Sequence, residues 1–318
     1  MNELGLVEWI VRSASRARNV RVGPGDDAAV IACDARRDLV FTIDEVVEGT
    51  HFRLTGAGLG PRATGRDVGV KALLAAASDL AAMGADPLAA VAAAALPKGA
   101  ACLPSGKAAR LGRTICLGLR DAARRIGCPL VGGNVTGTSG PVTVTVACIG
   151  RVPRGRAFLR KGARPGDALF VTGQLGGSAL GRHLRPCPRL AEAKRLRELG
   201  GVRAMMDVSD GLALDLSRLA RASGVGAVLD LDAVPVSAAA RRLARSTGRS
   251  PQEHALGDGE DYELLFALDR ASAAKIERLW RLPTRVTHIG EIVPRAKGLA
   301  VREGGRTRRL RPAGYVHL

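Results

Sequence analysis

Two acidic segments near the start of the chain carry residue types suited to holding a divalent cation. In the first, a Gly-Asp-Asp turn at residues 25–27 leads into an apolar run at 28–33. In the second, the apolar run 38–43 is followed by Asp44. Two carboxylates about 4 Å apart repel by roughly 4 kcal/mol at an effective dielectric of about 20, and an oxygen-liganded ion such as Mg²⁺ removes that repulsion. Glycine and aspartate also favour turns, so a plain turn is the simpler explanation of the first segment on its own.

A further carboxylate falls on the apolar face of a predicted helix at residues 66–83. The residues that recur there at helical spacing are Val68, Ala72, Ala75, Asp79 and Met83. An unpaired carboxylate on an apolar face is costly, so either a basic residue or a metal ion must meet Asp79. This position is a second, independent indication of a cation site.

Another acidic centre lies in the C-terminal half, where Asp207, Ser209 and Asp210 come directly before a helical stripe of leucines. One helix N-cap needs only one such residue, and three are present. Further along, residues 257–266 turn through glycines and acids into an apolar strand. Strand-end acids and glycine turns therefore recur in both halves, a pattern that fits a metal-dependent enzyme acting on phosphates.

The composition fits a globular α/β protein of about two domains. The chain has 318 residues, 46% of them hydrophobic, and 40 glycines. Its net charge of +18 raises the question of nucleic-acid binding, but the basic residues are mostly arginines scattered along the chain, and only 3% of residues are aromatic. We therefore expect no nucleic-acid partner, and a basic surface that attracts phosphorylated small molecules.

The six cysteines, at positions 33, 102, 116, 128, 148 and 187, have no metal-binding spacing. Several lie in apolar runs, so we expect buried, reduced thiols in a cytoplasmic protein. The first residues lack the pattern of a signal peptide, and the Ala-rich stretch 72–96 is interrupted by Asp79, Asp86 and Pro87. We therefore expect no membrane span.

The remaining pattern alternates between helices and strands. Helices are expected at 3–18 and 107–126, and strands at 87–96, as a buried strand, and at 141–150. A strand at 129–131 is expected to end at Gly132-Gly133, where backbone N–H groups can approach a phosphate. The polar, basic segment 151–164 marks a boundary, which divides the chain into domains of 1–150 and 151–318.

The chain contains no Walker-type GxxxxGK[ST] motif, no GxGxxG that opens a helix after a strand, and no nucleophile signature. Taken in order, its motifs resemble the thiamine-monophosphate kinase family of the aminoimidazole-ribonucleotide-synthetase-like superfamily. The resemblance covers nearly the whole chain and rests on residues 25–29, Asp44 with 47–52, 71–73, 78–85, 132–133, 162–167, 207–212 and 259–264. Each motif is short, but their joint order is highly specific.

This resemblance implies two α/β domains, of which the N-terminal one binds ATP and Mg²⁺ and dimerises through its sheet. The implied reaction transfers a phosphoryl group from ATP to thiamine monophosphate, in line and directly, with several Mg²⁺ ions. By similarity, the metal ligands are Asp27, Thr42, Asp44, Asp79, Asp207 and Asp210. The implied ATP contacts are Gly133, Asn134, Arg160 and Ser209. The implied contacts to thiamine monophosphate are His51, Glu260 and Tyr315.

The chain departs from the family pattern at three points. A basic residue that the family usually has shortly after the Gly-Gly motif is not evident in residues 137–140. Asn134 and Val135 follow Gly132-Gly133 where the family has Asp and Thr, so one ligand charge is missing. The strand end Thr42-Ile43-Asp44 lacks one hydroxyl of the usual Thr-Thr-Asp. Two alternatives therefore stay open: an ATP-dependent enzyme of the same superfamily that uses another small molecule, and a nucleotide-binding homologue without catalytic activity.

Overall fold

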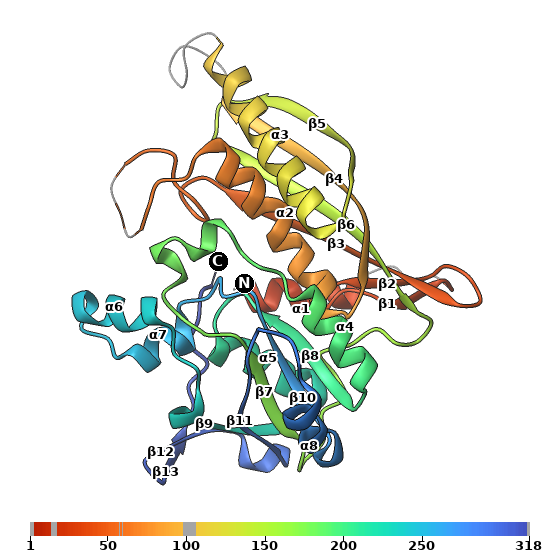
Figure 1. Ribbon diagram of the computed structural model, residues 1–318, viewed down its shortest axis with the longest axis vertical. Coiled ribbons are helices and arrows are strands. Elements are labelled where there is room, and N and C mark those ends of the chain that lie inside the picture. Colours follow the sequence, from red (N-terminus) through yellow and green to blue (C-terminus); the bar gives the residue numbers. More distant parts are fainter. Residues whose placement is uncertain (1–2, 14–17, 57, 59, 98–105, 317–318) are drawn as a thin grey trace.

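The computed structural model describes the chain except for residues 1–2, 14–17, 57, 59, 98–105 and 317–318, and it contains two mixed β-sheets with helices packed against them (Figure 1). The sheet of the N-terminal half lies in the upper part of the view, and the sheet of the C-terminal half lies below it. The predicted α/β fold with two sheet-containing parts is thus confirmed. The division at residue 150 stays a prediction; the first sheet extends to Pro153 and the second begins at Ala168.

The N-terminal sheet has the strand order β1, β2, β3, β6, β4, β5, and all neighbours are antiparallel except β4 and β5. The strands are β1 Val20–Val22, β2 Ala29–Ala32, β3 Arg37–Val47, β4 Asp86–Pro97, β5 Leu130–Thr138 and β6 Thr143–Pro153. The helices of this half are α1 Glu3–Ser13, α2 Gly65–Ala82 and α3 Lys107–Ile126.

The helices that the structure describes cover one face of this sheet. In β3, Val40, Thr42 and Val46 are buried on the side of α2, while Phe41 and Ile43 are 41% and 65% exposed. A reciprocal capping box between Thr64 and Asp67 starts α2, and most of this helix is buried between the sheet, α3 and the C-terminal half. The helix therefore positions its side chains rigidly at the junction of the two sheets.

The C-terminal sheet has the strand order β13, β12, β9, β11, β7, β10, β8, with one parallel pair, β12 and β9. Its strands are β7 Ala168–Thr172, β8 Val202–Val208, β9 Gly226–Asp230, β10 Glu263–Leu268, β11 Val286–Val293, β12 Leu299–Glu303 and β13 Arg306–Arg309. The α-helices are α4 Leu190–Leu199, α5 Leu212–Ser223, α6 Ala238–Thr247, α7 Pro251–Gly257 and α8 Arg270–Leu279. Short 3₁₀ turns are η1 Ser178–Leu180, η2 Arg182–Leu184, η3 Leu231–Ala233 and η4 Arg295–Lys297.

Three element predictions need correction. The helix expected at 3–18 does not include Arg18, which lies in a turn. In this turn the Asn19 carbonyl accepts a hydrogen bond from Ala32 N–H. Residues 14–17 lie outside the described part. Strand β4 is not fully buried, because the helices cover one face only, and Val91 is 43% exposed. Strand β5 does not end at Gly132-Gly133 but continues to Thr138, because these residues pair in parallel with β4.

The expected burial of the cysteines is also only partly right. Cys128 and Cys148 are buried, but Cys33, Cys116 and Cys187 are exposed free thiols, and Cys102 lies outside the described residues. Among the helices that the structure describes, none combines the length and apolarity needed to cross a bilayer.

Candidate active site

A cleft of about 230 Å³ is lined by residues of both halves of the chain. Strand β3 and helix α2 contribute one wall, and the segments after β8 and before β10 contribute the other. The predicted site residues that line the cleft are Asp44, His51, Asp79, Asp207, Ser209, Asp210, Glu260 and Tyr315. Folding thus brings together acids that lie up to about 200 residues apart in the sequence.

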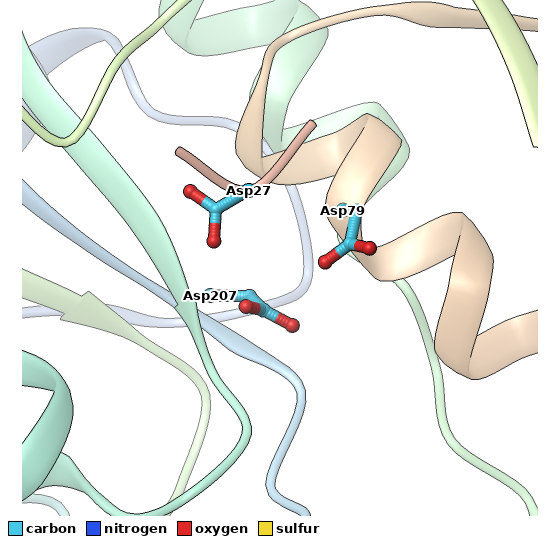
Figure 2. A group of neighbouring side chains, drawn as sticks. All are labelled: Asp27, Asp79 and Asp207. Carbon is cyan, nitrogen blue, oxygen red and sulfur yellow. The ribbon is translucent and has the colours of Figure 1, made fainter. Parts of the chain in front are cut away.

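Three aspartates from three separate elements converge beside this cleft, and two of them, Asp79 and Asp207, line it (Figure 2). Asp27 lies in the turn before β2, Asp79 on α2, and Asp207 near the end of β8. One oxygen from each carboxylate lies within 4.8 Å of the others. Such a group of hard oxygen donors is typical of a site for Mg²⁺ or a similar ion.

Burial and mutual repulsion act on these carboxyl groups in the same direction. Burial, with further contributions from the Asp207 and Asp27 charges, raises the pKa of Asp79 well above its ordinary value. Burial and then the charge of Asp27 raise the pKa of Asp207 to about 8. Hydrogen bonds oppose this rise only in part: Thr42 Oγ1 donates to Asp79, and Ser78 Oγ donates to Asp207 at 2.6 Å.

The donor set fits a divalent cation. Oδ2 of Asp27 is buried and has no hydrogen-bond partner among the described residues. The other oxygen, Oδ1, accepts from Arg160 Nη2 at 2.7 Å. A cation among the three carboxylates would give Oδ2 a partner and relieve the repulsion that raises the pKa of Asp79 and Asp207.

The turn that carries Ser209 and Asp210 is held by a carboxylate that the sequence analysis did not single out. Asp215 is fully buried on the first turn of α5, and its Oδ2 accepts from the backbone N–H of Ser209 at 3.1 Å and of Asp210 at 3.0 Å. Arg218 pairs with both Asp215 and Asp210. Burial and the Asp210 charge raise the pKa of Asp215 to about 7, which Arg218 opposes.

The segment before β10 is a strained loop with several anchors. Glu260 and Tyr262 both have a φ of 53°, a backbone conformation that residues other than glycine rarely adopt. Backbone N–H groups of these two residues donate to the carbonyls of Ser209 at 2.6 Å and Val208 at 2.8 Å. Between them, buried Asp261 accepts from Gly176 N–H at 2.9 Å and pairs with Arg182. Lys71 of α2 pairs with the Glu260 carboxylate.

Two further predicted residues are oriented by backbone hydrogen bonds. His51 Nδ1 accepts from Val47 N–H at 3.0 Å, so in this arrangement the ring proton of a neutral His51 is on Nε2. Tyr315 is 44% exposed at the cleft, and its N–H donates to the carbonyl of Asp210 at 2.9 Å. Main-chain contacts thus orient the His51 ring and place the Tyr315 backbone beside Asp210.

Gly133 and Asn134 are not among the residues that line the cleft. Asn134 pairs with Ala93 of β4, and Ala93, Thr145 and Glu45 form one cross-strand row with it. Because directly paired residues share a face, Asn134 lies on the face of the sheet that the helices leave open. Glu45 belongs to the same row and also lines the cleft, so the open face and the cleft adjoin.

The chain matches two family models, the AIR synthase related protein N-terminal domain over residues 25–152 and the AIR synthase related protein C-terminal domain over residues 164–301. The thiamine-monophosphate kinase of Rhodopirellula baltica is 40% identical over 307 residues, which cover 94% of this chain and 92% of the relative. The thiamine-monophosphate kinase of Escherichia coli K12 is 33% identical, with 98% and 96% of the two chains covered.

Solved structures of the same kind match over nearly the full length. A structure described as "AaThiL complexed with AMPPCP and TMP" has a TM-score of 0.82 at 28% identity and covers 100% of this chain and 97% of its own. A thiamine-monophosphate kinase from Stenotrophomonas maltophilia has a TM-score of 0.70 at 32% identity, with 94% and 96% covered.

Proposed function

The chain belongs to the AIR synthase related family, and within it to the thiamine-monophosphate kinases, and from this premise we propose that it transfers the γ-phosphoryl group of ATP to thiamine monophosphate. The products are thiamine diphosphate and ADP. The observation that carries the proposal is the convergence of Asp27, Asp79 and Asp207, with the orphaned Asp27 Oδ2 among them. We expect the reaction in the cytoplasm, where exposed thiols such as Cys33 and Cys187 stay reduced.

The acceptor in this reaction is a phosphate oxygen that already carries negative charge, so no strong general base is required. What limits the reaction is the repulsion between two phosphorylated substrates. Mg²⁺ ions held by Asp27, Asp79 and Asp207, with Thr42, Asp44 and Asp210 beside them, would neutralise that charge and orient the phosphates. The role of the fold is to fix these carboxylates on three rigid elements before the substrates arrive.

The residues assigned to ATP fall into two groups. Arg160 lies at the acidic cluster, where its ion pair with Asp27 leaves other guanidinium nitrogens for a phosphate. Ser209 lines the cleft. Asn134 belongs to the open sheet face next to it, and Gly133 precedes it on β5, so we propose that the nucleotide extends from the acidic cluster to Asn134 on that face. Thiamine monophosphate, the acceptor, is assigned to the part of the cleft that is lined by His51, Glu260 and Tyr315.

We propose a homodimer in which two copies bury the apolar part of the open face of the N-terminal sheet against each other, apart from the position of Asn134 that we assign to the nucleotide. Apolar side chains follow one another across this face, from Phe41 and Ile43 on β3, through Ala147 and Ile149 on β6, to Val91 on β4. An exposed apolar sheet face of this kind is typical of a protein–protein interface. The open face of the sheet is then explained, because the partner subunit would cover it.

Phe41→Asp together with Val91→Asp is expected to convert the dimer into a monomer, because two buried carboxylates without partners would face each other across the interface. Sedimentation velocity at micromolar concentration measures the change. Leu117→Asp, at an exposed leucine of α3 outside the proposed interface, is the control and should stay dimeric. A double variant that sediments like the wild type would place the interface elsewhere.

The wild-type protein is expected to form thiamine diphosphate from ATP and thiamine monophosphate only when Mg²⁺ is present. Product is quantified directly by chromatography, and a reaction in which excess EDTA chelates the Mg²⁺ is the control. Absence of product while ATP still binds would contradict the proposal and favour another acceptor or a non-catalytic homologue. Asn134→Asp separates those two, since it restores a ligand charge but cannot change the acceptor.

A further inference from the structure

Helix α2 contains a buried lysine that the proposed reaction does not use. Lys71 is 0% exposed and lies among the apolar and small residues of a helix packed against both sheets. Burial lowers its pKa, and the carboxylates of Glu260 and Asp44 oppose that effect. A buried ammonium group persists only where an acid and hydrogen-bond acceptors meet it, so its partner is informative.

That partner, Glu260, belongs to the other half of the chain and lies on the strained loop before β10. Lys71 Nζ donates to Glu260 Oε1, while the Glu260 side chain keeps 28% of its surface exposed and lines the cleft. Lys71 itself does not line the cleft. Glu260 therefore lies between the buried ammonium group and the space where a substrate would bind.

Glu260 shares the cleft with other negatively charged side chains, which repel its carboxylate. The same cleft is lined by Asp44, Asp207 and Asp210, all of the same charge. Like charges that line one cleft repel each other, and a cation paired with Glu260 offsets this repulsion. Lys71 is placed to do this, and its position on α2, two helical turns before Asp79, ties Glu260 to the helix that carries part of the acidic cluster.

Resting on the proposed kinase activity, we propose that Lys71 is a positioning residue that holds the Glu260 carboxylate in the cleft to receive the cationic ring of the acceptor. Thiamine carries a permanently charged thiazolium ring, which a carboxylate at a fixed place attracts. Lys71 binds one carboxylate oxygen, Oε1, so the other oxygen of this cleft-lining residue is available to a substrate. The loop strain at Glu260 and Tyr262 supports this, because strained backbone persists where surrounding contacts fix it.

The test is a double-mutant cycle of Lys71→Met and Glu260→Gln, with KM for both substrates, kcat, and the inhibition constant of unphosphorylated thiamine. Lys71→Met is expected to raise KM for thiamine monophosphate about tenfold, with kcat and KM for ATP changed by less than about threefold. The inhibition constant of thiamine should rise in parallel, because thiamine has the ring but not the phosphate. Arg66→Met, on the same helix α2 as Lys71, breaks a surface pair with Asp121 and is the control.

The double variant decides whether Lys71 acts through Glu260. If it does, the double variant has the KM of Glu260→Gln alone. The double variant also removes both charges together, so it remains informative should Lys71→Met alone fail to fold.

A double variant with a KM well above that of Glu260→Gln overturns the proposal. A rise in KM for thiamine monophosphate without a rise in the thiamine inhibition constant also overturns it, because Lys71 would then act on the phosphate. An inactive wild type would instead refute the kinase activity itself.

Discussion

Asp207→Asn is expected to abolish phosphoryl transfer and at the same time to make the metal-free protein harder to unfold. The substitution keeps the shape of the side chain and an oxygen that can accept from Ser78 Oγ. It removes one of three carboxylates whose oxygens lie within 4.8 Å of one another. We expect kcat/KM to fall at least about a thousandfold, which corresponds to about 4 kcal/mol of lost transition-state stabilisation.

The stability of the metal-free variant should change in the opposite direction. A like-charged pair about 4 Å apart repels by roughly 4 kcal/mol at an effective dielectric of about 20, and part of this is already relieved by protonation. We therefore expect the free energy of unfolding to rise by about 1–3 kcal/mol in EDTA at pH 8. Chemical denaturation of both proteins measures the difference. Asp121→Asn, at a surface carboxylate paired with Arg66, is the control and should change little.

The pH dependence of this gain has a fixed sign. The pKa of Asp207 is raised from 3.8 to about 8 in the folded protein, so the folded state binds a proton that the unfolded state has lost. The stability that this proton contributes is present at low pH and is lost as the pH rises from about 4 to about 8. The advantage of the Asn variant should therefore grow over this range.

Saturating Mg²⁺ should remove most or all of the stability advantage of the variant. An ion at a hundred times its dissociation constant stabilises the folded wild type by about 2.7 kcal/mol, and the variant should lack most of this shift. A metal-free variant less stable than the wild type, or an equal Mg²⁺ shift in both, would contradict a cation site at these three aspartates.

Three acids of the cleft could be predicted from the sequence because each of them breaks a local pattern. Asp79 interrupts an apolar helix face, and Asp207 and Asp210 exceed what a helix cap requires. These anomalies are local, so they are visible without a structure. Their convergence is not, because it depends on how α2 and β8 pack against each other across about 130 residues of sequence.

Lys71 and Asn134 illustrate what the sequence could not supply. A lysine in an Ala-rich helix looks the same whether its ammonium group reaches solvent or a buried partner, and the partner here is 189 residues away. Asn134 follows a Gly-Gly pair that predicts a turn, yet the glycines continue an edge strand because β4 offers them parallel hydrogen bonds. In both cases tertiary contacts outweigh the local pattern.

Arg160→Met is expected to have the opposite effect on stability from Asp207→Asn. Arg160 donates to Asp27 Oδ1 at 2.7 Å, and the Asp27 side chain is fully buried. Removing one partner of a buried ion pair leaves an uncompensated charge and costs about 3–5 kcal/mol. In EDTA the variant should therefore lose about this much free energy of unfolding, because Asp27 then faces Asp79 and Asp207 without a counter-ion.

Mg²⁺ should restore much of this loss, since a bound cation replaces the missing charge beside Asp27. The Mg²⁺-induced rise in melting temperature is thus expected to be larger in Arg160→Met than in the wild type. Arg203→Met is the matched control: it breaks another arginine–aspartate pair, with Asp167, outside the cleft, and it should destabilise without any added response to Mg²⁺.

The kinetics of Arg160→Met distinguish a counter-ion from a residue that also binds ATP. If Arg160 contacts the nucleotide, KM for ATP rises and kcat falls about a hundredfold even at saturating Mg²⁺, because a guanidinium stabilises phosphate charge that the metal ions do not reach. Activity that returns fully with Mg²⁺ would assign Arg160 to Asp27 alone. An unchanged Mg²⁺ response would separate Arg160 from the cation site, because the two share the Asp27 carboxylate and a change at one oxygen must be felt at the other.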